Sequence, residues 1–421
     1  MGLKFNRKVL KRPHANTVAR PNQNFYRKIL ANGMTVIFEK RNIPVVSVAF
    51  AVRMGGVNES EEEKGISHFV EHMLYKGTPT RNAKKIAEDI EKVGGELNGF
   101  TADTLTAYWC KMPSKHLNLA LNVLSDMIKN PLFNEKEFEK EKKVIFEEIK
   151  MCKDNPLKHV FNGIEKTLYE KPFNIGILGT YETLNSIDRG EMIKKFKKIY
   201  TSDNMILAVV GDADFDEIVN FAEKNFGDEK GKVPVFEIKK KNKTKIETRK
   251  GIDQANLVFA HHVPISKDEK HYSAYVLNCL MAGGMSSRLF SEIREKRNLA
   301  YAVKGDANIN RDFAYNLIYV GTTKENVGVV KGLILKEFEK VAKDLDEKEL
   351  AEVKEQMIGN YYISMEDSQS QMINLILSEI CGNANKFYEF EKNINNVKLK
   401  DVKELAKNAT QKFSFFALVP E

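Results

Sequence analysis

The sequence predicts an α+β fold of two similar domains, each a mostly antiparallel sheet packed with helices. The chain has 421 residues, well above the roughly 250–300 residues at which a single hydrophobic core stops growing. Strand-like and helix-like segments of the first half recur in the same order in the second half. A segment rich in Gly, Pro and Lys, without apolar periodicity, separates the halves and is typical of a linker. These observations together indicate one plan used twice.

Each half combines an alternating strand, an amphipathic helix, a later helix and a closing apolar strand. The alternating strands and the helices after them are recognised by repeats of two and of about 3.6 residues. The closing strands are apolar throughout, which is typical of a strand in the middle of a sheet. The equivalent segments, first half before second, are 106–110 and 313–317, 115–128 and 324–338, 188–200 and 400–409, and 204–211 and 413–420.

The composition along the chain sets the expected domain boundaries. We expect a first domain at residues 23–228, a linker at 229–250 and a second domain at 251–421. Residues 1–22 form a basic arm, because the first acidic residue of the chain is Glu39. Such a leader can be an organellar targeting segment, but this one lacks Ser and mixes Lys with Arg. We therefore expect a solvated arm, with the organellar matrix as the alternative location.

Composition and charge argue against several classes of partner. No window approaches the roughly 20 apolar residues of a membrane span, so no membrane partner is expected. The net charge of +8 is spread along the chain rather than gathered in one basic stripe, which argues against nucleic acid. The cysteines lie far apart without a Cys-x-x-Cys pair, at Cys110, Cys152, Cys279 and Cys381. This spacing argues against a cysteine zinc site and fits a reducing compartment, here the cytoplasm.

The segment around His68 carries the pattern of a metal site. His68 and His72 fall one helical turn apart, about 6 Å along the axis, so both imidazoles lie on one face and can bind one zinc ion at about 2.0–2.1 Å. Glu71 shares this face and can act as a general base toward water on the metal. Ser67 is the expected N-cap of this helix. The alternative is a pair of buried histidines that only bond backbone carbonyls.

A catalytic zinc needs a third protein ligand, and the acidic segment at residues 135–150 can supply it. Most carboxylates in such a charged run are solvated, but helical phase separates two neighbours. Glu147 lies beside lysines and faces water, whereas Glu148 faces inward. An inward carboxylate is costly unless it is paired or binds metal. Glu148 is therefore the expected ligand, with Glu141 two turns earlier as a supporting carboxylate. The other residues expected on the inward face are Val144, Ile145, Met151 and Cys152.

With these residues the chain resembles the pitrilysin/insulinase family of zinc metallopeptidases, the inverzincins, over nearly its whole length from about Gln23. It is most similar to the half-size branch that includes the subunits of mitochondrial processing peptidase. The resemblance implies one zinc ion per chain, held by His68, His72 and Glu148, with Glu71 as the base and Glu141 behind the ligands. It also implies a clamshell assembly of two chains, here a homodimer, with peptides as substrates.

Two further segments are similar to segments of this family. Residues 285–301 resemble the segment whose Arg and Tyr, seven residues apart, grip substrate, and these fall on Arg294 and Tyr301. From the residues alone, an Arg on a charged helix and a Tyr in the core are the simpler interpretation. Residues 94–101 resemble the edge strand beside the zinc, where Asn98 would position an extended peptide. The alternative for that segment is a plain Gly-Gly bend.

The expected function is a zinc endopeptidase that hydrolyses short or unfolded peptides inside a chamber. The zinc residues and the Arg/Tyr pair lie in different halves, so the pair is expected to reach the zinc centre of a partner chain. Residues 150–158 are mainly basic, whereas presequence-processing relatives carry acidic residues there, so arginine-directed cleavage is not expected. Two alternatives stay open: a non-catalytic scaffold or substrate-binding subunit of a larger peptidase or respiratory assembly, and a maturase for one dedicated peptide.

Overall fold

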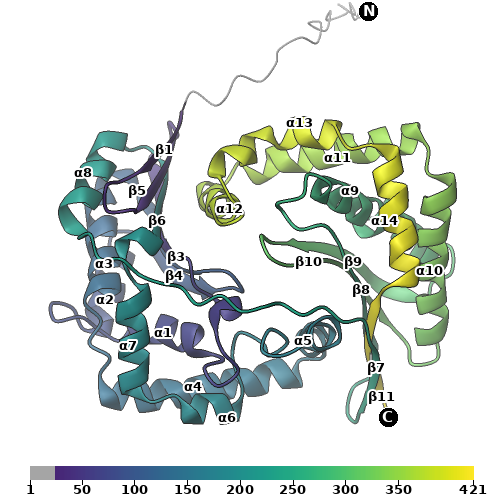
Figure 1. Cartoon of the computed structure of the whole chain (residues 1–421), viewed down its shortest axis with the longest axis horizontal. Helices are drawn as coiled ribbons and strands as arrows, with labels where there is room; N and C mark the ends of the chain where they lie inside the picture. The colour runs from purple at the N-terminus through teal and green to yellow at the C-terminus, as the bar shows by residue number, and fades with distance from the viewer. Residues whose placement is uncertain (1–23) are drawn as a thin grey trace, which may run out of the picture.

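The computed structural model describes residues 24–421, which form two sheet-and-helix domains (Figure 1). The two-domain α+β prediction is therefore confirmed. The basic arm predicted for residues 1–22 lies outside the described residues. Among residues 24–421, no helix combines the length and the apolar composition that a bilayer crossing needs.

The first domain is built on a six-stranded sheet in the order β1-β2-β6-β3-β5-β4. Within it only β2 and β6 run parallel to each other. The strands are β1 (Phe25–Ile29), β2 (Thr35–Lys40), β3 (Val45–Val52), β4 (Glu96–Thr101), β5 (Thr106–Pro113) and β6 (Met205–Gly211). The helices are α1 (Ile66–Leu74), α2 (Ala83–Glu91), α3 (Leu117–Lys129), α4 (Glu135–Asp154), α5 (Pro156–Leu168), α6 (Tyr181–Ser186), α7 (Arg189–Ile199) and α8 (Phe215–Asn225).

The second domain has a five-stranded sheet in the order β7-β11-β8-β10-β9. Its one parallel pair is β11 with β7. The strands are β7 (Thr244–Arg249), β8 (Ala255–His262), β9 (Ala300–Ile309), β10 (Ala314–Thr322) and β11 (Ser414–Pro420). The helices are α9 (His271–Ala282), the π-helical segment Phe290–Glu295, α10 (Val327–Asp344), α11 (Glu347–Ser364), α12 (Ser368–Ile380), the 3₁₀ turn Ala384–Glu389, α13 (Phe390–Asn395) and α14 (Leu399–Gln411).

The repeat expected from the sequence is present in the structure. The predicted strand and helix pairs correspond to β5 with α3 and β10 with α10, and the closing pairs to α7 with β6 and α14 with β11. β6 and β11 occupy matching inner positions of the two sheets and are buried, apart from the last residue of β11. By the same order, α1, β4 and α4 of the first domain correspond to α9, β9 and α11 of the second.

The connection between the domains is shorter than the linker expected at residues 229–250. Residues 244–249 form β7, which pairs in parallel with β11 at the edge of the second sheet. Most of this strand is exposed, including its only apolar residue, Ile246. An edge strand with so little apolar burial gives no apolar alternation, so its sequence is indistinguishable from a charged linker.

Each sheet is covered on one face by its own helices and on the other by a helix from the opposite domain. α5, which belongs to the first domain in sequence, packs on β8 and β11 of the second sheet (Figure 1). Its apolar residues Val160 and Ile164 join Val258 and Phe416 in one buried cluster. The Ser414 hydroxyl also donates to the carbonyl of Thr167 at the end of this helix, at 2.9 Å.

α12, which belongs to the second domain, packs in turn on β3 and β6 of the first sheet. Its residues Leu375 and Ile376 cover a face of that sheet on which Ala49 and Ala208 leave room for the helix. Polar contacts secure both ends of the contact. Arg27 of β1 makes a two-pronged pair with the buried Glu379, at 2.8 and 2.7 Å, and the hydroxyls of Ser47 and Ser368 lie 2.9 Å apart.

Gly163→Ala should destabilise the chain even though Ala is the better helix former. A Cβ at Gly163 would lie 2.5 Å from the Phe416 ring, so α5 would have to move off the second sheet. Overpacking of this kind costs about 1–3 kcal/mol. Urea unfolding of the pure protein measures the difference. The matched control is Gly332→Ala on α10, where a Cβ meets nothing within 4 Å and about 1 kcal/mol of stabilisation is expected. Equal effects of the two substitutions would contradict the tight contact between α5 and β11.

Candidate metal centre

The helix that carries the two histidines, α1, is fixed at its start by a loop carboxylate. Its N-cap is Gly65, whose φ of 95° favours glycine. The buried Glu59 carboxylate accepts the N–H of Gly65 at 3.1 Å and of Ser67 at 2.7 Å, which satisfies donors of the first turn. The prediction that Ser67 caps this helix was wrong. The capping group lies eight residues before Ser67, too far to give a local sequence signature.

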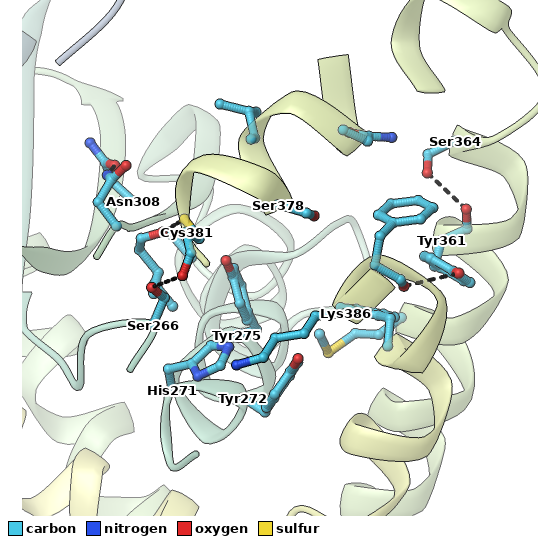
Figure 2. A pocket seen from close by; sticks show the side chains of 18 of the residues that line it. Ser266, His271, Tyr272, Tyr275, Asn308, Tyr361, Ser364, Ser378, Cys381 and Lys386 are labelled. Carbon is cyan, nitrogen blue, oxygen red and sulfur yellow. Dashed lines mark hydrogen bonds between the residues drawn. The ribbon is translucent and has the colours of Figure 1, made fainter. Parts of the chain in front are cut away.

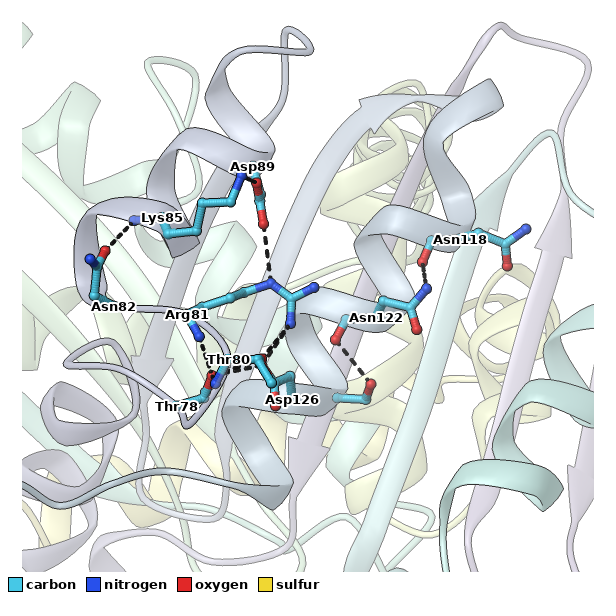
Figure 3. A network of polar contacts seen from close by, with 10 residues as sticks. Thr78, Thr80, Arg81, Asn82, Lys85, Asp89, Asn118, Asn122 and Asp126 are labelled. Carbon is cyan, nitrogen blue, oxygen red and sulfur yellow. Dashed lines mark hydrogen bonds and ion pairs between the residues drawn. The ribbon is translucent and has the colours of Figure 1, made fainter.

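The loop that leaves α1 is held by a polar network centred on Asp126 of α3 (Figure 3). Its Oδ2 accepts hydrogen bonds from the hydroxyls of Thr78 and Thr80, both at 2.7 Å, and from the guanidinium of Arg81 at 2.6 Å. Arg81 also pairs with Asp89 of α2 at 3.1 Å. The network ties the connection between α1 and α2 to α3, so both ends of the histidine helix are anchored.

His68, His72 and Glu148 come together where α1 packs on α4. One ligand atom from each lies within 4.8 Å of the others. The Nε2 atoms of the two histidines each lie 3.6 Å from a different oxygen of Glu148. Ligand atoms at about 2.0–2.1 Å from a tetrahedral zinc are about 3.4 Å apart. The spacing of this cluster is therefore close to that of three zinc ligands.

Both imidazoles can present an unprotonated Nε2 to a metal. Burial, with a smaller contribution from His72, lowers the pKa of His68 to about 3, so this ring is neutral at pH 7. Nδ1 of His72 lies 3.0 Å from Oε2 of Glu141, and because a carboxylate accepts, that nitrogen carries the hydrogen. Glu141 is buried and also pairs with Lys76 at 2.7 Å. A carboxylate behind a histidine in this way orients the ring as a ligand.

The helical phase of α4 separates Glu147 from Glu148. The Glu148 side chain is 32% exposed and faces the histidines, whereas that of Glu147 is 69% exposed and pairs with Lys150. Two neighbours that the sequence placed on the inward face, Val144 and Met151, are exposed instead. The inward face of α4 is therefore narrower than expected, because α4 buries little besides Phe138, Glu141 and Ile145.

Glu71 is held beside the cluster by strand β4. The Thr101 hydroxyl donates to its Oε2 at 2.6 Å. Burial raises the pKa of Glu71, and the hydrogen bond from Thr101 opposes the increase. The other oxygen, Oε1, faces β4 at Gly99, where an added Cβ would lie 3.4 Å from it and 2.6 Å from the Tyr75 hydroxyl. Gly99 therefore keeps space open beside the carboxylate.

The site predicted from the sequence includes neither Thr101 nor Tyr75, although both side chains lie near Glu71 in the structure. The Tyr75 hydroxyl is buried and has no hydrogen-bond partner within residues 24–421. Its signal in the sequence is only a Tyr three residues after His72, which is equally typical of a core residue. Thr101 ends the Gly-rich segment that was expected to form the edge strand, and only the folded strand brings its hydroxyl to Glu71.

Asn98 lies exposed on β4, the edge strand of the first sheet beside α1. Its Oδ1 accepts the N–H of Gly99 at 2.8 Å. Arg294 and Tyr301 lie in the second domain, on the π-helical segment Phe290–Glu295 and on β9. The Arg294 guanidinium stacks over the Tyr301 ring at 5.5 Å and over Phe290 at 4.8 Å. Tyr301 is 78% exposed, so it is not the core Tyr that its sequence alone would suggest.

Comparison with known proteins covers both domains. The model of the insulinase family, peptidase family M16, matches residues 35–181, and the model of the peptidase M16 inactive domain matches residues 186–357. An uncharacterized zinc protease of Bacillus subtilis is 35% identical over 89% of this chain and 93% of its own. The chain belongs to peptidase family M16. The expected resemblance to the half-size members of this family is confirmed.

Solved structures show the same M16 fold. A protease from Helicobacter pylori matches with a TM-score of 0.87 at 20% identity, over 94% of this chain and 99% of that one. A chain in the structure of complex III2 from Candida albicans matches with a TM-score of 0.83 at 17% identity, over 94% and 95%. At such identities the likeness shows the fold alone.

Asp126→Asn should lower the free energy of unfolding at pH 7 by about 2 kcal/mol, because four donors lose a charged acceptor. Burial alone would raise the pKa of Asp126, but hydrogen bonds from Asn130, Thr78, Thr80 and Arg81 outweigh it and hold the pKa below its ordinary value. A carboxyl whose pKa is lowered on folding stabilises the fold above its unfolded-state pKa and loses that effect as the pH falls.

The difference in stability between the wild type and Asp126→Asn should therefore be constant above about pH 5, begin to shrink near the unfolded-state pKa of about 3.9, and be lost as the pH falls on through the lower pKa of Asp126 in the folded chain. Urea titrations across this range measure it. Asp228→Asn, at an exposed residue outside helices and strands, is the control and should leave stability unchanged at each pH. A difference that does not depend on pH would show that the Asp126 charge has no part in the network.

Proposed function

We propose that this M16 chain is a zinc endopeptidase that hydrolyses short or unfolded peptides. The observation that carries the proposal is the convergence of His68, His72 and Glu148 within 4.8 Å, with Glu71 on the same helix as the histidines. Two imidazoles and one carboxylate are the donor set of a catalytic zinc site that keeps a position open for water. The names of relatives as zinc proteases support the same metal.

The donor chemistry of the cluster fits one zinc ion per chain. His68 and His72 would bind it through Nε2 and Glu148 through a carboxylate oxygen, while Glu141 holds the His72 ring. Zinc bound in this way supplies Lewis acidity that lowers the pKa of a water molecule to about 7. This pairing of two histidines with a carboxylate disfavours Mg²⁺ or Ca²⁺, which prefer oxygen ligands alone.

Glu71 would serve as the general base and later as the general acid. The Thr101 hydroxyl holds Oε2, so Oε1, beside Gly99, is the oxygen that would take a proton from the attacking water. The same oxygen would return the proton to the nitrogen of the leaving amine, which restores the carboxylate. The raised pKa of Glu71, caused by burial, brings it closer to the range in which a carboxyl exchanges protons at neutral pH.

The edge strand β4 would bind the substrate by strand addition. Among residues 24–421, β4 is paired only with β5, so its other edge can offer N–H and C=O groups to an extended peptide. A peptide there would run past Asn98, Gly99 and Glu71. Recognition through backbone groups favours short or unfolded peptides over folded proteins. The mainly basic stretch at residues 150–158 argues against selection of substrate arginines.

The complete site would be composite, with Arg294 and Tyr301 supplied by a second copy of the chain. Both side chains lie in the second domain, and Tyr301 is exposed. A guanidinium and a phenol can donate to the scissile carbonyl and to the oxyanion that develops on it. A homodimer of clamshell form would then hold two equivalent sites, each built from both chains.

A non-catalytic scaffold is the main alternative, and the M16 fold of a chain in the complex III2 structure of Candida albicans gives it a precedent in shape. The complete set of metal ligands with Glu71 beside it favours an enzyme, since a scaffold needs neither the ligands nor a general base. A maturase for one peptide would use the same chemistry.

The four cysteines form no disulfide, which supports a reducing compartment and the cytoplasm as the site of action.

Glu148→Gln should lower zinc content and peptide hydrolysis together, because an amide is a far weaker zinc ligand than a carboxylate. Metal analysis of the purified protein should find about one zinc per wild-type chain and much less in this variant. The matched control is Glu147→Gln, one residue away and turned toward Lys150, which should keep both zinc and activity. Equal zinc content in the two variants would remove Glu148 from the ligand set.

Glu71→Gln separates the base from the ligands in the same experiment. This variant should keep its zinc and lose hydrolysis of a mixed peptide library by about 100-fold or more, since the amide cannot take a proton. A variant that keeps near wild-type kcat would rule out Glu71 as the base. A wild-type chain without zinc and without hydrolysis would instead favour the scaffold.

Two inactive variants should restore activity when they form a mixed dimer. In a dimer of one Glu71→Gln chain and one Tyr301→Phe chain, one site carries both defects and the other carries neither. Mixing the two chains should therefore recover up to about half of wild-type activity per dimer. The control is each variant mixed with itself. No recovery, with mixed dimers verified by mass spectrometry, would show that Tyr301 acts within its own chain or not at all.

A further inference from the structure

The second domain contains a cavity of about 600 Å³ that is separate from the metal centre (Figure 2). It lies between α9, the end of β9, α11, α12 and the 3₁₀ turn before α13. Ligand sites in proteins commonly enclose about 300–1,000 Å³ and combine aromatic walls with a few polar groups. The cavity has the size and the mixed lining of such a site.

The cavity is framed by the counterparts of the elements that frame the metal centre. α9, β9 and α11 hold the places that α1, β4 and α4 hold in the first domain. A gap-free alignment of residues 63–72 with 269–278 matches Glu, Lys, Ser and Val at four positions. It places Ala274, Leu277 and Asn278 where the first domain has His68, Glu71 and His72. The second repeat therefore keeps the frame but has lost the metal-binding groups.

In the described part of the chain, Lys386 carries the one ammonium group that lines the cavity. Figure 2 shows its side chain reaching toward His271. The pKa of His271 is lowered chiefly by burial, and the charge of Lys386 adds to that decrease. Within residues 24–421, no carboxylate lies within 4.0 Å of this ammonium and no hydrogen bond involves it. His271 donates its Nδ1–H to the Asp268 carbonyl at 2.7 Å, and the Asp268 carboxylate acts on the pKa of His271 in the direction opposite to Lys386. Lys386 is exposed and is the cation of the cavity lining, whereas Asp268 lies outside that lining.

Several carboxylates act on this region from outside the cavity lining, among them Asp268 on His271, Asp312 on Cys381 and Glu391 on Tyr361. Burial raises the pKa of Tyr272 and of Tyr275, and Glu389 and Asp306 respectively add to that increase. Neither Glu389 nor Asp306 lines the cavity. An anion inside would therefore meet the ammonium of Lys386 without a competing carboxylate on the wall.

Aromatic rings and neutral polar groups make up most of the remaining wall. Tyr272, Tyr275, Phe387 and Phe390 supply flat apolar surface. On α12, the amide of Asn374 and the hydroxyl of Ser378 line the cavity one helical turn apart, and neither side chain has a hydrogen-bond partner within residues 24–421. Such groups can form hydrogen bonds with a ligand without adding a charge to the cavity.

We propose that this cavity binds a carboxylate attached to an apolar or aromatic body. The carboxylate pairs with Lys386 at the opening, and the body lies among the tyrosines and phenylalanines. One cation with neutral donors matches a single negative charge, whereas phosphate groups are met by several cations or by backbone N–H groups. The C-terminal residue of a peptide and a free arylalkyl carboxylic acid both have this chemistry.

Calorimetric titration of the full chain tests the proposal. The chain carries Glu71→Gln and zinc, so that bound peptide is not consumed. The probes are 3-phenylpropionate, the peptide N-acetyl-Ala-Phe with a free carboxylate, and the C-terminal amides of both. The acids should bind at least about tenfold more tightly than their amides, the ratio expected for a charge-assisted contact. Lys386→Gln should reduce acid binding by a similar factor. Lys392→Gln is the matched control, an exposed lysine on α13 that does not line the cavity.

The two acids identify the source of the ligand. Tighter binding of the peptide acid assigns the cavity to peptide C-termini, and tighter binding of 3-phenylpropionate assigns it to a free acid. Equal affinities for acid and amide, unchanged acid affinity in Lys386→Gln, or the absence of saturable binding by every probe would overturn the proposal. Because binding is measured without turnover, this result is independent of whether the chain is a peptidase.

Discussion

The reciprocal packing of α5 and α12 is the constraint on which the rest of the structure depends. Each sheet has two apolar faces, and each domain has enough helices for only one of them. α5 covers the second sheet and α12 covers the first, in clusters that include Ile164 with Phe416 and Ile376 with Ala208. Burial of this apolar surface supplies the main driving force for joining the domains, and the Arg27–Glu379 pair fixes their register.

This packing also reaches the metal centre through one short connection. α4 carries Glu148, and only Asn155 separates the end of α4 from the start of α5. Asn155 closes α4 and caps α5, where its side chain accepts the N–H of Lys158. The third ligand therefore belongs to a helix whose continuation is docked on the opposite domain, whereas the two histidines are held by Glu59 and the Asp126 network within their own domain. The distance between α1 and Glu148 thus depends on how the two domains sit together.

The parts of the site that depend on local periodicity could be predicted from the sequence. The spacing of His68, Glu71 and His72 places them on one face of any helix, and phase alone separates Glu148 from Glu147. The repeated order of strands and helices likewise follows from apolar patterns within each segment. Contacts between distant segments left no such trace. Thr101 reaches Glu71 only after β4 pairs with β5.

Other features were missed for related physical reasons. Glu59 caps α1 from a loop, and β7 is too exposed to show a strand pattern. The exchange of α5 and α12 could not be predicted, because an amphipathic helix shows that it has an apolar face but not which sheet that face covers. The exposure of Val144 and Met151 has the same origin, since only the folded chain shows where α4 lacks a neighbour.

The exchanged helices change what a break in the backbone would do. Residues 227–239, between the last helix of the first domain and the second sheet, form neither helix nor strand. A cut there would leave two fragments. The first fragment would hold α12 of the second fragment against its own sheet, and its α5 would stay packed on the sheet of the second fragment. The two pieces would remain a tight noncovalent pair, as in fragment complementation, and neither would be complete alone. The covalent linker therefore serves mainly to keep the halves in equal number, while the helices hold them together.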